Sequence, residues 1–576
     1  MTDLNLPKKW KRNRDLMDVF FNDDEIGSIK KRLKNLEIKV VSLCAFESRF
    51  AKSGGLATVI KALLPALAGM KKMKRVLLMT PFYPKIISAS QLTPTGIEPF
   101  NVEYGGNSIK VELLKYVPQE EGVEEYYLKA PGFFGARNDP YSYCPDDPKR
   151  NHEAQRENAL FFCRAVPRAM KALGIREHIV FHLKEWQTAL MALTCKEAML
   201  DGTLESAGCV LSMHNPFDSW IPLENLAKIT ANKTIRENSL LLGKNGLTAY
   251  QLGMQLVDAP VTTVSEHFAE ELTSDLLQTG HFADHLQDIL KKNPLVGINN
   301  GMFVDFPLDF SPGEKYTVSR VKKIKLAKRK ALLNILATYR PEKRFGRLTY
   351  NNENITRLPD DIPILVMSGR LDPFQKGFDI LLRAVEKFSR DEIKVILTPM
   401  PTRESNLDYF REVAGKCEGN ITVFPIRMEK GFLELQIGST FGIMPSIYEP
   451  FGAAVEYMVN GTVNIARSTG GLVNQIRHRR CGFLYRENPQ YYTLENIKAF
   501  AQSNEAVQSR GANPWVKSMV DELYKTIQEA AALYRDHEDD YYRMILAGFK
   551  QAKTFTWQKA VEGYYKVYEQ SKEGLP

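Results

Sequence analysis

The chain has 576 residues, which predicts two domains with additional segments. Its net charge is +9, and its 44% hydrophobic and 25% charged residues are typical of a globular protein. No apolar run approaches the ~20 residues that a membrane-spanning helix needs, and the opening MTDLNLPKKWKRNR lacks the apolar core of a signal peptide. The seven cysteines show no CxxC or Cys/His spacing, which predicts a reducing, cytoplasmic setting and no zinc site. The charge fits a phosphate-bearing partner, but nucleic-acid-binding signatures are absent.

The first structured segment reads as a strand, a glycine-rich loop and a helix. Ile38–Ser42 is a buried-strand pattern, and Thr58–Leu67 has apolar residues at helical spacing. The loop between them holds Lys52, Gly54 and Gly55: the lysine can meet a phosphate charge, and the glycines allow close approach of a ligand to the backbone. This order predicts the first unit of a nucleotide-handling α/β domain, although KSGGL alone is a weak signal.

Two later strands end in polar side chains. Val180–Leu183 is followed by Lys184 and Glu185, and Cys209–Met213 is followed by His214. A lone histidine at a strand end is more often structural than functional. Ligands of open α/β sheets bind at the carboxyl ends of strands, however, and this position favours a site at His214.

In the second half, Ile362–Met367 reads as a strand that leads into a loop with Arg370 and Lys376. Arginine binds phosphate as a fork and lysine as a point charge, so the two cations suit a diphosphate. Taken alone, such cations in a loop are usually only solvated.

The most informative stretch runs from Phe441 to Val473. A strand at Phe441–Pro445 precedes a loop with Glu449, and the helix Ala453–Val459 carries Glu456. The N–H groups near that helix start are expected to hold the Glu449 carboxylate in place. A Gly-rich turn then opens another helix and would point free N–H groups at an anion. The turn consists of Ser468, Thr469, Gly470 and Gly471.

The phrase MPSIYEPFG…NGTVNIARSTGGL closely resembles the signature of the bacterial glycogen synthase and plant starch synthase family, glycosyltransferase family 5. Further segments resemble family motifs in the same order: KSGGL, the strand-end HN, VTTVSEHFAEEL, GINNG and SGRL…QKGFD. The resemblance covers about residues 37–570 and is strongest over Met444–Leu472, Val261–Leu272 and Ser368–Asp379.

The resemblance implies an α/β protein of the GT-B fold: two Rossmann-like domains facing across a cleft, with a C-terminal helix crossing back to the first domain. The expected divisions are a charged N-terminal extension (1–36), an acceptor-side domain (37–310), a basic helix with a linker or insertion (311–361), a nucleotide-sugar domain (362–535), and a C-terminal helical segment packing on the first domain (536–576).

The implied activity is a retaining transfer of glucose from ADP-glucose or UDP-glucose to the non-reducing end of an α-1,4-glucan such as glycogen, starch or a maltooligosaccharide. No metal, other cofactor, nucleic acid or membrane is implied, and a homo-oligomer is left open. The implied catalytic residues are Glu449, His214, Arg370 and Lys376. The implied substrate-binding residues are Lys52, Gly54, Gly55, Glu47, Glu185, Asn300, Glu456, Ser468, Thr469, Gly470 and Gly471.

The chain departs from the family pattern at several positions. Thr58 stands in place of an aspartate, Lys184 and Glu185 in place of His-Asp, and Met428 in place of a tyrosine that commonly lies against the nucleotide base. A rebuilt turn is expected at Thr398–Pro401. These departures keep two alternatives open: a transferase with another acceptor, and a weakly active relative that binds glucan or nucleotide as a regulatory subunit.

Overall fold

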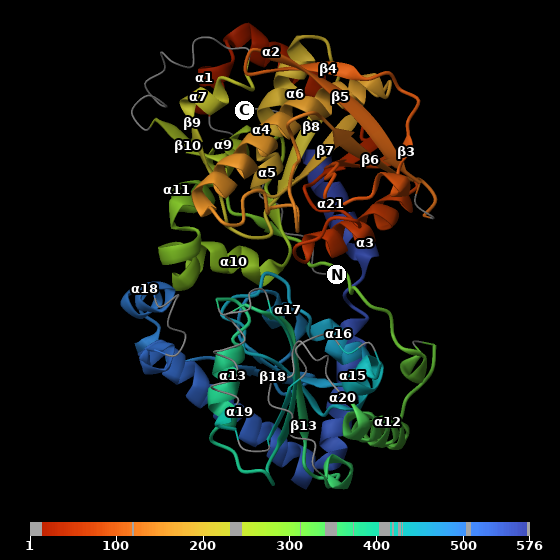
Figure 1. Ribbon diagram of the computed structural model, residues 1–576, viewed down its shortest axis with the longest axis vertical. Coiled ribbons are helices and arrows are strands. Elements are labelled where there is room, and N and C mark those ends of the chain that lie inside the picture. The colour runs from red at the N-terminus through yellow and green to blue at the C-terminus, as the bar shows by residue number, and fades with distance from the viewer. Residues whose placement is uncertain are drawn as a thin grey trace. The chain divides into compact units, whose positions relative to one another are not determined.

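The structure is a computed structural model that describes residues 14–117, 120–230, 245–311, 313–339, 354–372, 374–401, 415–417, 420–423, 428, 430–502 and 509–572. The chain divides into two compact units, shown in Figure 1. The first unit comprises Met1–Val264, Phe282–Gly301 and Trp557–Pro576, and the second Ser265–His281 and Met302–Thr556. In the described part of the chain, no helix has the length and apolarity required to cross a membrane.

The first unit is built on a sheet with the strand order β12-β11-β8-β7-β1-β2-β6-β5-β3, and β4 also pairs with β5. The strands from β12 to β6 are parallel, whereas β3, β4 and β6 run antiparallel to β5. The bounds are β1 Val40–Cys44, β2 Arg75–Pro81, β3 Thr93–Pro94, β4 Phe100–Tyr104, β5 Asn107–Tyr116, β6 Val123–Lys129, β7 Ile179–Lys184, β8 Ala207–Ser212, β11 Thr262–Thr263 and β12 Val296–Gly297; a separate pair joins β9 Trp220–Pro222 to β10 Gly246–Thr248.

The parallel strands of the first unit are buried because helices cover them. One group of helices packs around α4 and α6, and α3 packs against α21, whose Tyr564 and Tyr568 lie in the same apolar core as Val41 and Val180. Parallel sheets need such cover on both faces. The helices are α1 Arg14–Phe20, α2 Asp23–Lys34, α3 Leu56–Ala68, α4 Pro148–Ala172, α5 Trp186–Ala189, α6 Met191–Leu200, α7 Leu223–Leu226, α9 Ala249–Leu256, α11 Gln287–Lys292 and α21 Trp557–Gln570.

The second unit holds a parallel sheet with the order β15-β14-β13-β16-β17-β18. The order reverses between β13 and β16, which is where open α/β sheets bind ligands, at the carboxyl ends of the strands. The bounds are β13 Ile364–Leu371, β14 Lys394–Pro401, β15 Ile421–Val423, β16 Phe441–Met444, β17 Val463–Arg467 and β18 Gly482–Tyr485.

The helices of the second unit form two groups on this sheet. One contains α13 and α19, and the other contains α12, α15, α16 and α20 (Figure 1). Their bounds, with those of three further helices, are α10 Glu266–Ser274, α12 Val318–Thr338, α13 Phe378–Val385, α15 Phe432–Gly438, α16 Ala454–Val459, α17 Gly471–Gln475, α18 Leu494–Gln502, α19 Pro514–Asp536 and α20 Glu538–Ala552.

These units differ from the expected divisions in three places. Helix α20 packs on α12, α16 and α19 of the second unit, and only α21 belongs to the first. The basic helix α12 is part of the second unit, where the buried Lys325 donates to the Ser439 carbonyl. Helices α1 and α2 are packed parts of the first unit, with Leu16, Ile29 and Leu33 fully buried. In each case apolar area buried by tertiary contact outweighs the charged surface visible in the sequence.

The turn expected at Thr398–Pro401 is instead the end of strand β14. This segment stays paired with β13 as far as Leu371 and Pro401, and the Thr398 hydroxyl donates to Ser368 Oγ at 2.6 Å. The turn was expected because the resembled family has a Gly-rich turn at this position. The pairing with β13 decided otherwise.

Candidate active site

The predicted site residues fall into two groups, one within each unit, and each group gathers at the carboxyl ends of parallel strands. In the second unit, Arg370 is the second-last residue of β13, Glu449 follows β16 and Ser468 follows β17. In the first unit, Glu47 follows β1 and Glu185 follows β7. His214 and Asn300 follow β8 and β12 there. The prediction that Glu185, His214 and Glu449 follow strands is confirmed within each unit, whereas Arg370, expected in a loop, lies within β13.

The centre of the second group is an ion pair. Lys376 Nζ donates to Glu449 Oε2 at 2.6 Å, and Ser446 Oγ donates to the same oxygen at 3.0 Å. The Glu449 side chain is only 9% exposed and that of Lys376 24%. Gly377 follows the lysine in the left-handed region (φ +69°), where a Cβ would collide with the Pro445 carbonyl oxygen. The turn therefore brings Lys376 onto the loop that carries Glu449.

Helix α16 does not hold Glu449 in place, contrary to the prediction. The first N–H groups of α16, those of Ala454 and Val455, donate to Gln475 Oε1 at 2.9 and 3.2 Å. Glu449 makes its side-chain bonds to Lys376 and Ser446 instead. A helix-capping role for Glu449 is thus excluded, and its carboxylate is held by a cation and a hydroxyl.

The prediction that the Ser468–Gly471 turn offers free N–H groups is also wrong for this structure. Ser468 N–H donates to the Tyr485 carbonyl, Thr469 N–H to the Arg467 carbonyl, and Gly471 N–H to the Glu449 carbonyl at 3.0 Å. Gly470 N–H donates to the carboxylate of Glu271 at 2.8 Å. Every N–H of the turn therefore has a partner within the second unit.

Glu271 is a residue that sequence reasoning missed. It lies on α10 and also accepts a bond from the Thr469 hydroxyl at 3.3 Å. Burial raises the pKa of Glu271 to about 7, with the nearby Asp275 carboxylate adding to the shift. The Glu271 carboxylate therefore accepts the hydrogen bonds that the turn was expected to donate to a phosphate. The segment VTTVSEHFAEEL contains this glutamate, but its partner lies about two hundred residues away in sequence.

The two remaining members of the second group lie close to the pair in sequence. The Arg370 guanidinium donates to Gln375 Oε1 at 3.0 Å, within the loop that leads to Lys376. Burial raises the pKa of Glu456, on α16, to about 7. Glu456 Oε2 is buried and has no hydrogen-bond partner among the described residues, so it can still accept a bond from a ligand hydroxyl.

In the first group, Glu47 organises the glycine-rich loop. Its Oε2 accepts N–H bonds from Ser53, Gly54 and Ala57 at 3.1 to 3.3 Å, and its Oε1 accepts a bond from the Tyr141 hydroxyl at 3.2 Å. Glu47 therefore positions the loop. Lys52 is exposed on that loop.

Glu185 sits in a strained, buried position. Its backbone φ is +66°, which is rare for a residue with a Cβ and is concentrated at functional sites. Its carboxyl accepts bonds from the Tyr250 hydroxyl at 2.6 Å and from the His214 N–H at 3.0 Å. Burial raises the pKa of Glu185 to about 8 despite these bonds. The side chain thus connects the ends of β7 and β8.

We expect Glu185→Gln to change how stability depends on pH. The folded-state pKa of about 8 lies above the ordinary 4.5, so the stabilising effect of this group is complete below about 4.5 and is lost as pH rises through 8. Glutamine mimics the protonated form. As pH rises from 5.5 to 8.5, the free energy of unfolding of the variant should therefore increase by about 1 kcal/mol or more relative to that of the natural chain, measured by urea unfolding. A pH-independent difference would contradict the assignment.

His214 is the best-placed ligand group of the first unit. It is 7% exposed, and burial, with the nearby Lys184, holds the pKa of its imidazole well below the usual value. The ring is therefore neutral near pH 7. His214 Nε2 and Asn300 Oδ1 are both buried without a hydrogen-bond partner among the described residues. Burying a polar atom without a hydrogen bond lowers the stability of the fold unless a ligand or a water molecule supplies the missing partner.

Lys184 replaces a family histidine and is fully buried. Its Nζ lies 2.9 Å from His182 Nε2, and His182 Nδ1 lies 2.7 Å from the Tyr568 hydroxyl on α21. Burial lowers the pKa of Lys184 to about 7. This network joins β7 to the C-terminal helix within the first unit. Among the described residues, no group of three or more His, Cys, Asp or Glu side chains is arranged to hold a metal.

The two Rossmann-like sheets, with ligand-type side chains at their carboxyl edges and a C-terminal helix returning to the first unit, define a glycosyltransferase of the GT-B class. Family models described as the starch synthase catalytic domain and as glycosyl transferases group 1 match residues 39–292 and 350–512. The chain is a glycosyltransferase, and its sequence is similar to the bacterial glycogen synthase and plant starch synthase family.

Known relatives agree with this placement over most of the chain. The glycogen synthase of Geotalea daltonii is 28% identical and covers 84% of this chain and 94% of its own length. That of Koribacter versatilis is 25% identical, covering 91% and 96%. The catalytic domain of starch synthase IV from Arabidopsis thaliana, bound to ADP and acarbose, matches the fold with a TM-score of 0.61 at 18% identity over 88% of this chain and 99% of that one.

Proposed function

We propose that this glycosyltransferase moves glucose, with retention of anomeric configuration, from a nucleoside diphosphate glucose to the non-reducing end of an α-1,4-glucan. The observation that carries the proposal is the Lys376–Glu449 pair at the carboxyl edge of the second sheet, between β13 and β16. The names of the relatives, glycogen synthase and starch synthase, support the glucan acceptor.

In this proposal Glu449 stabilises the sugar and the cations stabilise the leaving group. Positive charge grows on the glucose ring as its bond to the diphosphate breaks, and a fixed carboxylate at Glu449 lowers the energy of that state. An ammonium has three donors, so the bond from Lys376 to Glu449 leaves two for phosphate oxygens. Arg370 adds a guanidinium fork. The proposal requires no metal ion or other cofactor.

The other buried groups take supporting roles in the proposal. His214 Nε2 and Asn300 Oδ1 are available for sugar hydroxyls, and Glu456 Oε2 for ribose hydroxyls. Glu47 and Glu185 position the strand-end loops of the first unit rather than touch the substrate. Because Glu271 occupies the Ser468–Gly471 turn, the diphosphate is assigned to Arg370 and Lys376.

The experiment that tests the function offers ADP-glucose, UDP-glucose and GDP-mannose separately, each with glycogen, and measures the nucleotide released. Release from a glucose donor that depends on glycogen supports the proposal. Release without any glycogen dependence would favour another acceptor. No release from any donor, with glycogen still bound, would favour a weakly active binding relative, for which the occupied turn at Gly470 is the structural argument.

We expect a relaxed or altered preference for the nucleotide base. Met428 stands where the resembled family commonly has a tyrosine, and a methionine side chain has no aromatic ring for a base to stack on; Met428 is also only 1% exposed. Loss of that stacking is worth roughly 0.5–1.5 kcal/mol, about tenfold or less in kcat/KM. The kcat/KM values for ADP- and UDP-glucose check this. A preference for ADP-glucose of about a thousandfold, roughly 4 kcal/mol, would mean that other residues read the base.

A further inference from the structure

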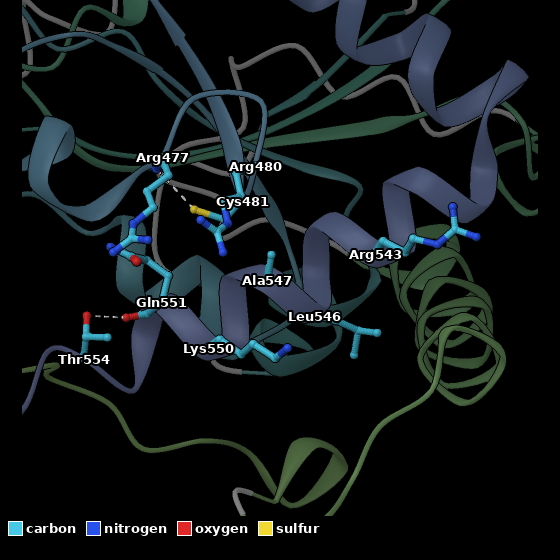
Figure 2. A pocket seen from close by; sticks show the side chains of 9 residues that line it. All are labelled: Arg477, Arg480, Cys481, Arg543, Leu546, Ala547, Lys550, Gln551 and Thr554. Atoms are coloured by element: carbon cyan, nitrogen blue, oxygen red, sulfur yellow. Dashed lines mark hydrogen bonds between the residues drawn. The ribbon is translucent and has the colours of Figure 1, made fainter.

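A basic cavity of about 370 Å³ lies within the second unit, between the segment that precedes β18 and helix α20. Figure 2 shows Arg477 and Arg480 extending from that segment toward α20, which carries Lys550 and Gln551. No acidic side chain is among the residues that line the cavity. Four cations from two facing elements, Arg477 and Arg480 on one and Arg543 and Lys550 on the other, thus border one small space.

Three of the four cations that line this cavity have no ion pair among the described residues. Within the part of the chain that the structure describes, no ion pair is found for Arg477, Arg480 or Lys550. Arg543, near the start of α20, differs because its guanidinium pairs with Asp540 at 2.5 Å and lies 3.9 Å from Asp539. Like charges brought together repel, so three such cations favour an anion between them.

The cavity is separate from the candidate active site and shares no residue with it. Arg477 and Arg480 precede β18, at its amino end, whereas Glu449 and Ser468 follow the carboxyl ends of β16 and β17. Cys481 in the lining is not a reactive group: it is 2% exposed, and burial raises the pKa of its thiol despite the neighbouring arginines. A nucleophilic or metal site is therefore not the explanation.

We propose that this cavity binds a small molecule that carries one or two phosphoryl groups. Guanidinium groups match phosphate oxygens as bidentate forks, and the lysine ammonium adds a point charge from the opposite element. The volume is within the range of small-molecule sites, about 300–1,000 Å³. A ligand bridging Arg480 and Lys550 ties the segment before β18 to α20. The proposal stands independently of the donor and acceptor assigned above.

The test is calorimetric titration of the whole protein with two probes, inorganic phosphate and fructose 1,6-bisphosphate, at fixed ionic strength. Fructose and citrate serve as the unphosphorylated and the non-phosphate anionic comparisons. The variants are Arg477→Gln/Arg480→Gln and Lys550→Gln, with Lys376→Gln to report on the candidate active site. The matched control, Lys498→Gln/Lys517→Gln, removes two exposed charges of the same unit from α18 and α19.

The expected result is binding of fructose 1,6-bisphosphate with a rise in melting temperature. The Arg477→Gln/Arg480→Gln variant should weaken this binding by at least about tenfold, and Lys550→Gln should also weaken it. The Lys498→Gln/Lys517→Gln control should change neither the affinity nor the rise in melting temperature. Because the side chains changed in the arginine, Lys550 and control variants are exposed, the melting temperatures of these variants without ligand should match that of the natural chain. Equal binding of citrate, loss of binding in Lys376→Gln alone, or unchanged affinity in the arginine variant would each overturn the proposal.

Discussion

Replacing Glu449 by glutamine should lower turnover by about 10²-fold or more while changing nucleotide affinity little. The substitution keeps the shape of the side chain and its bond from Ser446, but it removes the charge that faces the sugar in the proposed transition state. Losses of this size follow when one preorganised electrostatic group is removed. Steady-state kinetics with the preferred donor and glycogen, together with calorimetric titration of the nucleotide, measure both quantities.

Two variants separate this role from other roles of the same carboxylate. Lys376→Gln should weaken nucleotide affinity as well as turnover, because the lysine is assigned to the diphosphate. Glu495→Gln, an exposed carboxylate on α18, should change neither. If Glu449 served only to hold Lys376 in place, Glu449→Gln and Lys376→Gln would weaken nucleotide affinity to the same extent. A Glu449→Gln protein with near-normal turnover and a lowered melting temperature would show a purely structural role.

The second large effect is expected at Gly470, where alanine should destabilise the protein by at least about 3 kcal/mol. Gly470 has φ +48° and ψ −138°, a conformation that a residue with a Cβ rarely adopts. A Cβ at this position would also lie far inside contact distance of the Glu449 carbonyl oxygen. That oxygen accepts the Gly471 N–H, so the strain falls directly on the loop that carries the candidate catalytic carboxylate.

The matched control is Gly548→Ala on α20, in the same unit. The nearest atom to a Cβ at Gly548 is Met458 Cγ at 3.5 Å, an ordinary contact, and alanine favours a helix over glycine by about 0.5–1 kcal/mol. Gly548→Ala should therefore keep or raise the melting temperature. Denaturant unfolding of both variants measures the difference. A Gly470→Ala protein as stable as the natural chain would show that the Glu449 loop shifts at little cost.

Residues next to strong local patterns were predictable. The buried runs before Glu185 and His214 are short and apolar, and a parallel strand leaves its carboxyl end open to ligands, so these side chains were expected at strand ends. The inference that Lys376 lies beside a diphosphate, which rests on the two cations near its loop, stays a prediction. Each of these inferences needs only a few neighbouring residues, and each placement at a strand end is confirmed within its own unit.

The partners of these residues were not predictable, because they come from distant segments. The sequence by itself determined two α/β units with ligand-type residues after their strands, since strand and loop patterns are local. Only the tertiary structure decided that Glu449 bonds Lys376, that Gln475 caps α16, and that Glu271 occupies the turn at Gly470. A buried N–H or carboxylate takes whichever partner packing brings within about 3 Å, and packing is a property of the whole unit.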